Sequence, residues 1–390
     1  MSELDTHSVI AIACGGTGGH VFPGLAVAEA LQRRGWDIQL LISAKEVDQQ
    51  AVRTAAGMEV ITLPAVAWRR GIISCCRGLV KSYLQARSLF INERPHALLA
   101  MGGFACAAPV LAVPFRTPTF IHEANSVPGL ANRWLAPWVD EVFVYFPSAT
   151  TRFRRAAVTV TGMPVRAQFQ PMDSASCRTA LGLAPQRPVL LIMGGSQGAS
   201  GINSLILQTL PALVAQLPDL QFLHLTGTND GEKVKAAYAH LSCRAVVRPF
   251  LTEMEYALGA ATVAVSRAGA SSLAELAALR VPAILIPYPA AANNHQFRNA
   301  LALVESGAAR LVAQAVATPE NLTRLILDLF QNAALRQSLS NALARWHDPQ
   351  AAERIAERIA LAVKKEFAPT AGARRKANDL AAARLGSGDP

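Results

Sequence analysis

Residues 262–279 read TVAVSRAGASSLAELAAL, a stretch that joins a short apolar run to a glycine turn and a helical pattern. The run 262–266 is rich in β-branched residues, which indicates a buried parallel strand. The pattern at 273–279 indicates a helix, and the glycine turn before it leaves the first N–H groups of the helix pointing outward. Such N–H groups can bind an anion, for example a phosphate.

Glu275 follows Ser272 by three residues and Ser271 by four, so all three share one face of the first helical turns. A carboxylate there can accept two hydrogen bonds from a vicinal diol, such as that of a ribose. The alternative is a capping box, in which Ser272 is the N-cap and Glu275 bonds back to its backbone.

The chain then continues through a second apolar run at 283–287 into a polar segment. Residues 291–300 read AANNHQFRNA and offer several amides and an imidazole, the donor–acceptor groups that sugar hydroxyls need. A phosphate site, a diol site and a sugar site within one strand–helix–strand unit favour a nucleotide sugar as the ligand.

Composition limits the classes of protein to which the chain can belong. It has 390 residues, which favours two domains, and its mean hydropathy is +0.25. Its apolar runs are shorter than the ~18–20 residues of a membrane span, and residues 1–5 do not resemble a signal peptide. The six cysteines show no C-x-x-C spacing, so we expect reduced thiols and a cytoplasmic protein. The net charge of +10 favours an anionic partner.

The same pattern of strand, glycine turn and helix occurs twice. A strand at 8–13 leads into CGGTGGH and a helix at 23–34, and a strand at 188–193 leads into GGSQGA. The first turn is not a dinucleotide fingerprint, because Val21 stands where the third glycine belongs. Further strands are expected at 38–42, 97–100, 119–121, 142–144, 221–225 and 245–247. The sequence predicts an α/β protein of two facing, doubly wound Rossmann-like domains whose carboxyl-end loops line one cleft.

These motifs resemble those of the MurG family, bacterial cell-wall glycosyltransferases that move N-acetylglucosamine (GlcNAc) from UDP-GlcNAc to lipid I and form lipid II. The likeness runs from about Val9 to Ala300, and four blocks carry it together. They are Gly-Gly-Thr-Gly-Gly-His at 15–20, His-Glu-x-Asn at 122–125, Gly-Gly-Ser-Gln-Gly-Ala at 194–199, and 266–275. The resemblance implies the glycosyltransferase-B fold, with the donor in the C-terminal domain and the acceptor mainly in the N-terminal domain.

The resemblance also implies roles for individual residues. Arg166 and Ser196 would contact the diphosphate, the Leu251 backbone would meet the uracil, and Glu275 would bind the ribose. Other implied contacts are Asn125 and Gln296 to the sugar, Thr17, Gly18 and Gly19 from the acceptor side, and the donor-binding turn Ala270, Ser271, Ser272, Leu273, Ala274 and Glu275. The chain departs from the family where Phe104 and Cys106 replace hydroxyl-bearing residues and where Met163 replaces an amide.

Transfer from an α-linked UDP sugar to a β-linked product requires inversion, most simply by one in-line displacement. The reaction needs a base for the acceptor hydroxyl and groups that stabilise the charge developing on UDP. His20 and Glu123 are the two candidate bases, and the residue pattern leaves both open. The sequence contains no D-x-D motif, and helix N-termini with Arg166 can stabilise a diphosphate, so we expect neither a metal nor another cofactor.

We expect an acceptor- and membrane-facing domain at 1–163, a UDP-GlcNAc domain at 164–345, a closing helix at 346–367, and a basic, disordered tail at 368–390. Because lipid I is membrane-bound, the chain should be peripheral, on the cytoplasmic face of the inner membrane and against an anionic surface. The segment 66–91 has no acidic residue and interleaves two sets of side chains. The apolar set is Trp68, Ile72, Ile73, Leu79, Val80, Tyr83, Leu84 and Phe90. The basic set is Arg69, Arg70, Arg77, Lys81 and Arg87, and Phe115-Arg116 is expected to lie beside them. An ordinary amphipathic helix packed on the sheet is the alternative.

Other functions are consistent with parts of this pattern. Another glycosyltransferase-B enzyme, such as a glycolipid synthase or a UDP-GlcNAc 2-epimerase, would share the fold, and the epimerase would need no lipid acceptor. Nucleic-acid binding fits the charge but is disfavoured, because the sequence has no zinc, helix-turn-helix or RNP signature. The resemblance further implies other cell-wall synthesis proteins as partners.

Overall fold

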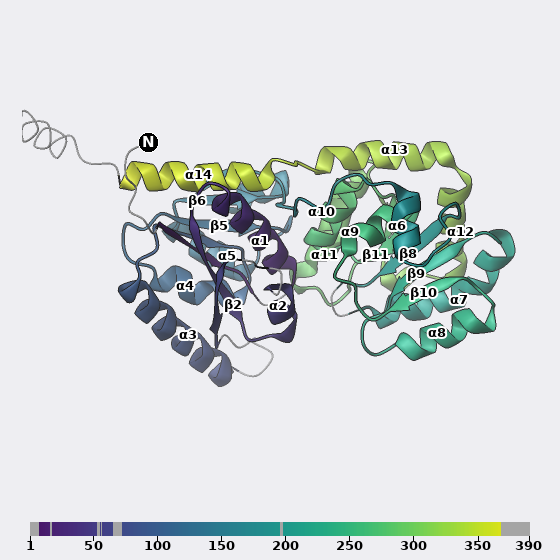
Figure 1. Cartoon of the computed structure of the whole chain (residues 1–390), viewed down its shortest axis with the longest axis horizontal. Coiled ribbons are helices and arrows are strands. Elements are labelled where there is room, and N and C mark those ends of the chain that lie inside the picture. Colours follow the sequence, from purple (N-terminus) through teal and green to yellow (C-terminus); the bar gives the residue numbers. More distant parts are fainter. Residues whose placement is uncertain are drawn as a thin grey trace, which may run out of the picture.

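In the computed structural model, the chain forms two α/β domains that lie side by side (Figure 1). The structure describes residues 8–15, 18–52, 55, 57–64, 72–195 and 198–367, without the side chains of residues 47, 50, 72, 73 and 75. The predicted tail at 368–390 therefore lies outside the described residues. The predicted fold class, two facing Rossmann-like domains, is confirmed.

The described part of the N-terminal domain is built on a parallel seven-stranded sheet in the order β3-β2-β1-β4-β5-β6-β7. The strands are β1 (Val9–Ala13), β2 (Asp37–Ser43), β3 (Glu59–Leu63), β4 (Ala97–Ala100), β5 (Thr119–Glu123), β6 (Glu141–Val144) and β7 (Ala157–Val160). The helices are α1 (Gly18–Gln32), α2 (Glu46–Ala51), α3 (Ile72–Asn92), α4 (Ala107–Ala112) and α5 (Leu130–Leu135). The central strands are buried on both faces, which explains their uninterrupted apolar sequences.

The described part of the C-terminal domain has a parallel six-stranded sheet in the order β10-β9-β8-β11-β12-β13. The strands are β8 (Val189–Met193), β9 (Gln221–Leu225), β10 (Ala245–Arg248), β11 (Val263–Ser266), β12 (Ala283–Leu285) and β13 (Arg310–Leu311). The helices are α6 (Ser174–Ala180), α7 (Ser200–Gln216), α8 (Gly231–His240), α9 (Met254–Ala260), α10 (Ala270–Ala278), α11 (His295–Glu305), α12 (Pro319–Gln331) and α13 (Ala333–Leu343).

The last helix, α14 (Ala351–Glu366), returns from the C-terminal domain and packs on the N-terminal domain (Figure 1). Ile355 and Ile359 are fully buried in the apolar core around α1. The Glu353 carboxylate pairs with Arg33 at 2.7 Å and with Arg34 at 2.9 Å. The domains are thus joined twice, by the segment 161–173 and by the crossing into α14.

Three strands and several helices, α13 among them, were not predicted from the sequence. β3 and β7 are edge strands whose side chains are largely exposed or half-buried, so they carry no continuous apolar run. β13 has only two residues, and α13 follows α12 after a single residue, Asn332. The first helix was predicted to begin near Pro23 but begins at Gly18, so the proline lies inside it.

Candidate active site

Four loops at the carboxyl ends of central strands converge on the space between the domains. In the N-terminal sheet these loops follow the neighbouring strands β1 and β4, and in the C-terminal sheet they follow β8 and β11. At each of these pairs the strand order reverses, which is where open α/β sheets bind ligands. The described residues of the predicted turns at 15–20, 194–199 and 267–275 thus follow the strands at which the order of each sheet reverses.

His20 lies in the first turn of α1 and reaches across to the loop after β4. Its Nδ1 atom is 2.9 Å from the carbonyl oxygen of Met101. A carbonyl only accepts, so Nδ1 carries the proton and Nε2 keeps its lone pair. Burial is the main cause that lowers the pKa of His20 below 6.5, partly offset by the nearby Glu123 carboxylate. A neutral imidazole with an unprotonated Nε2 can act as a general base.

The backbone after β4 leaves room for this imidazole. Gly102 and Gly103 have φ angles of 92° and 82°, the left-handed region that favours glycine. A Cβ atom on Gly103 would lie 3.2 Å from Nε2 of His20. Side chains at this turn would crowd the candidate base.

Glu123, the other candidate base, has its carboxylate oxygens occupied. Oε1 accepts hydrogen bonds from the backbone N–H of Asn125 at 2.9 Å and from its side-chain amide at 3.2 Å. Oε2 accepts from the Gly129 N–H at 3.0 Å and from the Asn132 amide at 2.8 Å. The side chain is 2% exposed. Four donors around one buried carboxylate indicate a residue that fixes the loop 124–129.

Asn125 connects this loop to the C-terminal domain. Its Oδ1 accepts a hydrogen bond from Nδ2 of Asn299 in α11 at 3.0 Å. The Asn299 Oδ1 accepts from both the backbone N–H and the hydroxyl of Ser126, each at 2.9 Å. Asn299 also donates to the Ala268 carbonyl at 3.3 Å, so one buried amide links the acceptor-side loop to the donor-side turn.

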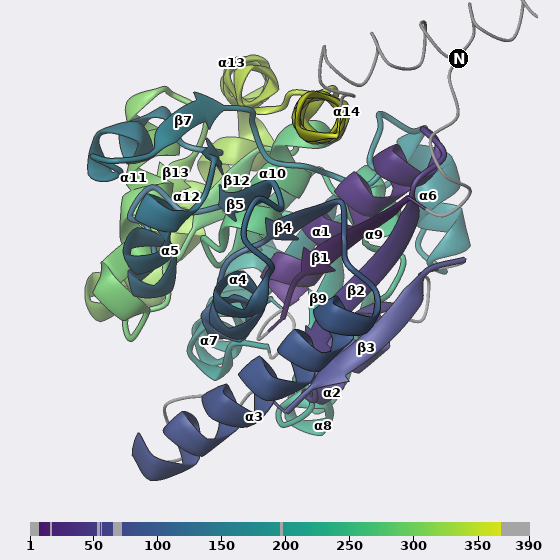
Figure 2. The same ribbon diagram turned by 90° about the vertical axis from the view of Figure 1, so that its left-hand side faces the viewer.

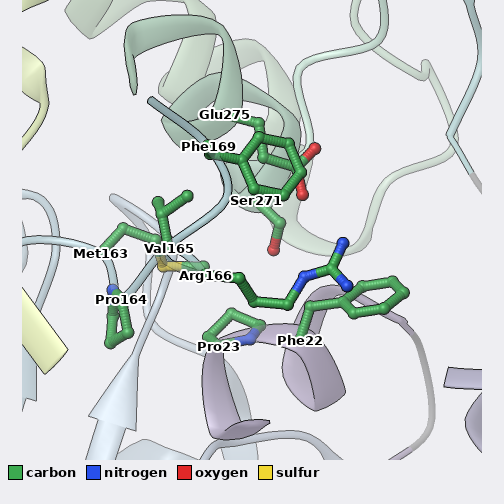
Figure 3. A pocket seen from close by; sticks show the side chains of 9 residues that line it. All are labelled: Phe22, Pro23, Met163, Pro164, Val165, Arg166, Phe169, Ser271 and Glu275. Carbon is green, nitrogen blue, oxygen red and sulfur yellow. The ribbon is translucent and has the colours of Figure 1, made fainter. Parts of the chain in front are cut away.

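A pocket between α1, the interdomain segment and α10 contains three of the predicted donor contacts, Arg166, Ser271 and Glu275 (Figure 3). It is lined by Phe22, Pro23, Met163, Pro164, Val165, Arg166, Phe169, Ser271 and Glu275. The guanidinium carbon of Arg166 lies 4.6 Å from the ring centre of Phe22 and 5.3 Å from that of Phe169. Arg166 is 8% exposed, and its Nε has no hydrogen-bond partner among the described residues. An arginine held in this way is suited to a diphosphate.

Glu275 faces the same pocket, and the capping-box alternative for it is wrong. The N-cap of α10 is Gly269, with no side-chain cap, and Ser272 lies inside the helix. Burial raises the pKa of Glu275 to about 7, against an opposing effect of Arg166. With a pKa of about 7, the Glu275 carboxyl group changes its charge state near neutral pH.

Two further predicted contacts are partly engaged within the protein. The Gln296 Oε1 accepts hydrogen bonds from the backbone N–H groups of Tyr288 at 2.9 Å and Ala268 at 3.3 Å. Both bonds use the amide oxygen of Gln296, so its Nε2 donors are not needed for them. Leu251 follows β10 and packs against the core of the C-terminal domain.

Two predicted residues lie outside the described part of the chain, and two residues at the site were not predicted. Thr17 and Ser196 lie outside the described residues, whereas Gly18 and Gly19 begin α1. Phe22 and Phe169 were missed because apolar side chains after a glycine turn or a linker carry no distinctive pattern. Within the described ranges, no cluster of three or more His, Cys, Asp or Glu side chains could hold a metal ion.

Of the three residues that depart from the family pattern, Cys106 and Met163 lie inside the protein, whereas Phe104 is half-buried. Cys106 is fully buried, and its thiol donates to the carbonyls of Ala13 and Gly102. Met163 is 2% exposed and lines the pocket of Arg166. Both substitutions therefore fill space beside the cleft.

Two facing Rossmann-like domains with a nucleotide-sugar type of site between them define an enzyme of the glycosyltransferase-B class. The sequence matches the glycosyltransferase family 28 N-terminal domain over residues 10–144 and the family 28 C-terminal domain over residues 189–358. The chain belongs to glycosyltransferase family 28.

Curated relatives are similar over most of their length. One, from Syntrophotalea carbinolica, is 38% identical over 88% of this chain and 96% of the relative. Another, from Verminephrobacter eiseniae, is 38% identical over 84% of this chain and 91% of the relative. Both are named UDP-N-acetylglucosamine--N-acetylmuramyl-(pentapeptide) pyrophosphoryl-undecaprenol N-acetylglucosamine transferase.

Solved structures show the same architecture. The crystal structure of Acinetobacter baumannii MurG has a TM-score of 0.69 and 27% identity, covering 90% of this chain and 99% of that one. A UDP-GlcNAc 2-epimerase from Neisseria meningitidis has a TM-score of 0.66 and 15% identity, covering 90% and 100%. At 15% identity the second likeness concerns the fold alone.

Proposed function

We propose that this chain is the transferase that moves GlcNAc from UDP-GlcNAc to the muramoyl 4-hydroxyl of lipid I, forming lipid II. The observation that carries the proposal is the pairing of a neutral His20 on one domain with the Arg166 and Glu275 pocket at the other. The names of relatives 38% identical over most of their length support the same reaction.

In this mechanism the C4 hydroxyl of the acceptor attacks the anomeric carbon of GlcNAc in line with the departing UDP. Nε2 of His20 takes the hydroxyl proton, a new β-1,4 bond forms, and the bond to the UDP oxygen breaks. Arg166 and the uncapped N-terminus of α10 stabilise the negative charge on UDP. The Glu275 carboxylate accepts hydrogen bonds from the ribose diol.

The direct test is incubation with labelled UDP-GlcNAc and a polyprenyl-diphosphate muramoyl acceptor, followed by extraction of the lipid phase. We expect label in the lipid phase only when the acceptor is present, and we expect it to persist with EDTA. Conversion of UDP-GlcNAc without acceptor would instead indicate an epimerase. Transfer to a different lipid would indicate a glycolipid synthase.

We also propose that α3 holds the protein on an anionic membrane surface. Within the described residues, no helix is long and apolar enough to cross a bilayer. One face of α3 is buried against the sheet through Ser82, Ala86 and Phe90, so Phe90 was wrongly assigned to the membrane. The opposite face exposes Val80 and Leu84 by more than half. The packed amphipathic helix and the membrane face thus describe two sides of one helix.

Charge on the same face favours an anionic surface. Arg77 and Lys81 are exposed on α3 beside Val80 and Leu84, and the Phe115 side chain after α4 is 90% exposed. α3 runs along the outside of the N-terminal domain (Figure 2). Trp68, Arg69 and Arg70 lie outside the described residues.

A further inference from the structure

Asn299, on α11, has a fully buried side chain that bonds to both domains beside the cleft. Its Oδ1 accepts hydrogen bonds from the backbone N–H and the hydroxyl of Ser126. Its Nδ2 donates to Oδ1 of Asn125 and to the carbonyl of Ala268. Asn125 and Ser126 belong to the acceptor-side loop 124–129, and Ala268 belongs to the turn between β11 and α10. One amide therefore connects a loop of the N-terminal domain to a turn of the C-terminal domain.

Partners with fixed roles determine how the amides of this network are oriented. The Glu123 carboxylate only accepts, so it faces Nδ2 of Asn125 and turns Oδ1 of Asn125 toward Asn299. The Ala268 carbonyl only accepts and the Ser126 backbone N–H only donates, which requires the same orientation of Asn299. Donors and acceptors are thus complementary from Glu123 in one domain to Ala268 in the other.

The network also reaches the second predicted sugar contact, Gln296. Its Oε1 accepts from the backbone N–H groups of Ala268 and Tyr288. These bonds use none of the NH₂ hydrogens of Gln296, and the bond to Glu123 uses one of those of Asn125. Both amides therefore have N–H donors left for the hydroxyls of a sugar.

We propose that Asn299 is a positioning residue that sets the acceptor-side loop against the donor sugar. By holding Asn125 and Ala268 together, it places N–H donors from the two domains around one sugar and fixes the loop for in-line attack. The inference rests on the proposed function, because the ligand between these amides is the GlcNAc of UDP-GlcNAc. A misplacement of about 1 Å can cost on the order of 10²-fold in rate, so loss of Asn299 should act on the chemical step.

Gln221 provides a matched control. It is also a fully buried amide, but its hydrogen bonds to Ala184 and Arg187 lie within the C-terminal domain. It is the first residue of β9 and lies at the end of the strand opposite to the cleft. Asn299→Leu and Gln221→Met each replace an amide by an apolar side chain of similar size. Ser126→Ala removes a single hydroxyl from the network and serves if Asn299→Leu does not fold.

The first experiment compares transfer kinetics at saturating donor and acceptor with UDP calorimetry and thermal unfolding. For Asn299→Leu we expect kcat to fall on the order of 10²-fold. The Kd for UDP should change by no more than about twofold, because UDP lacks the sugar that these amides contact. Ser126→Ala should lower kcat about threefold, since one hydrogen bond to Asn299 is lost and the others remain. Gln221→Met should lower the Tm without changing kcat.

The second experiment is amide hydrogen exchange, which does not depend on activity. Ser126→Ala changes the N-terminal domain, yet the amides of Ala268 and Tyr288 in the C-terminal domain should exchange faster than in the wild type. Both amides bond to Gln296, and Ala268 is held by Asn299. In Gln221→Met the two amides should exchange as in the wild type.

Wild-type kcat in a folded Asn299→Leu variant would overturn the inference, as would an equal loss of kcat in Gln221→Met. A rise in the Kd for UDP as large as the fall in kcat would also overturn it, because the residue would then support the donor pocket itself. Unchanged exchange at both amides in Ser126→Ala would show that Asn299 does not connect the domains. A wild-type protein that transfers no GlcNAc would overturn the proposed function, and the exchange experiment would still decide whether that connection exists.

Discussion

The hydroxyl of Ser271 in α10 donates a hydrogen bond of 2.9 Å to the carbonyl oxygen of Gly19 in α1, across the domain boundary. That carbonyl is available because of Pro23. In a regular helix the N–H four residues later would bond to Gly19, but proline has no N–H and its ring clashes with that carbonyl. A proline inside α1 thus frees an acceptor for the donor-side turn of the other domain.

Pro23→Ala should weaken this contact, because the new N–H competes with Ser271 for the Gly19 carbonyl. We expect a several-fold loss of kcat/KM for the donor, the scale of one neutral hydrogen bond of about 1 kcal/mol. Pro211→Ala is the matched control, since Pro211 also lies inside a helix but is exposed and remote from the cleft. Both variants should gain helix stability by thermal unfolding. Equal activity in the two would show that the Ser271 contact does not matter.

His20→Ala should lower kcat by about 10²-fold or more with little change in the donor KM, because a general base acts on the chemical step. The hydrogen bond to Met101 and the lowered pKa also make a pH prediction. The acid limb of wild-type kcat, measured with the donor saturating so that protonation of Glu275 does not limit binding, should lie below pH 6.5 and should be absent from the variant. Activity is measured against pH with saturating acceptor. A variant that keeps the wild-type profile would remove His20 from the mechanism.

Glu123→Gln should act mainly on stability. In the wild type, N–H groups of Asn125, Gly129 and Asn132 donate to the Glu123 carboxylate. In the variant, the amide NH₂ group would face some of these donors, which would then have no acceptor. We expect a loss of about 1–3 kcal/mol in the free energy of unfolding, typical of buried donors left unpaired. Glu320→Gln, an exposed change on α12, is the control. If Glu123→Gln unfolds like the wild type yet loses more activity than His20→Ala, Glu123 is the base.

The sequence predicted those parts of the fold whose pattern is local. Continuous apolar runs such as 221–225 marked buried parallel strands, because a strand covered on both faces needs no polar alternation. Edge strands such as β3 carry exposed glutamate and threonine and escaped detection. The return of α14 onto α1 also could not be predicted, since its amphipathic pattern does not say which domain it covers.

At the site, motif positions were predictable but hydrogen-bond partners were not. The chain order places His20 and Glu123 at the same edge of one sheet, yet nothing in it distinguishes a free lone pair from a saturated carboxylate. That difference arises from Met101, Gly129 and Asn132, whose approach depends on tertiary structure. The interdomain role of Asn299 was missed for the same reason.

Glu275→Gln should reduce donor use while stabilising the free protein. Loss of a charged acceptor for the ribose should raise the donor KM or lower kcat/KM by an amount equivalent to about 1.5–3 kcal/mol. The folded-state pKa of about 7 lies above the reference value of 4.5. Stability from the protonated form is therefore complete below pH 4.5 and is lost as the pH rises through about 7.

The Tm advantage of Glu275→Gln over the wild type should accordingly be small at pH 4.5 and should grow up to pH 8. Wild-type affinity for UDP should weaken below pH 7, as the carboxylate is protonated, and the variant should show no such step. Thermal unfolding and UDP calorimetry across this range measure both effects. A pH-independent Tm difference would mean that Glu275 stays ionised in the free protein.

The membrane face of α3 makes a prediction for flotation with vesicles of anionic or neutral lipids. Arg77→Glu/Lys81→Glu should abolish most binding to anionic vesicles, because each basic residue contributes about 1 kcal/mol near such a surface and two amount to roughly thirtyfold. Val80→Ser/Leu84→Ser should weaken binding to both lipids, since apolar burial does not depend on lipid charge. Both pairs are exposed, so folding should be unaffected.

Val316→Ser/Leu361→Ser provides the control, because these two aliphatic side chains are also more than half exposed but lie outside α3. If exposed apolar area alone caused binding, this pair would lower flotation as much as Val80→Ser/Leu84→Ser does. If α3 is only a packed helix, neither α3 variant should change flotation, and the membrane would have to be contacted elsewhere. We expect the α3 variants alone to lose flotation, with normal transfer to a soluble, short-chain acceptor, because α3 is distant in sequence from His20 and does not line the donor pocket.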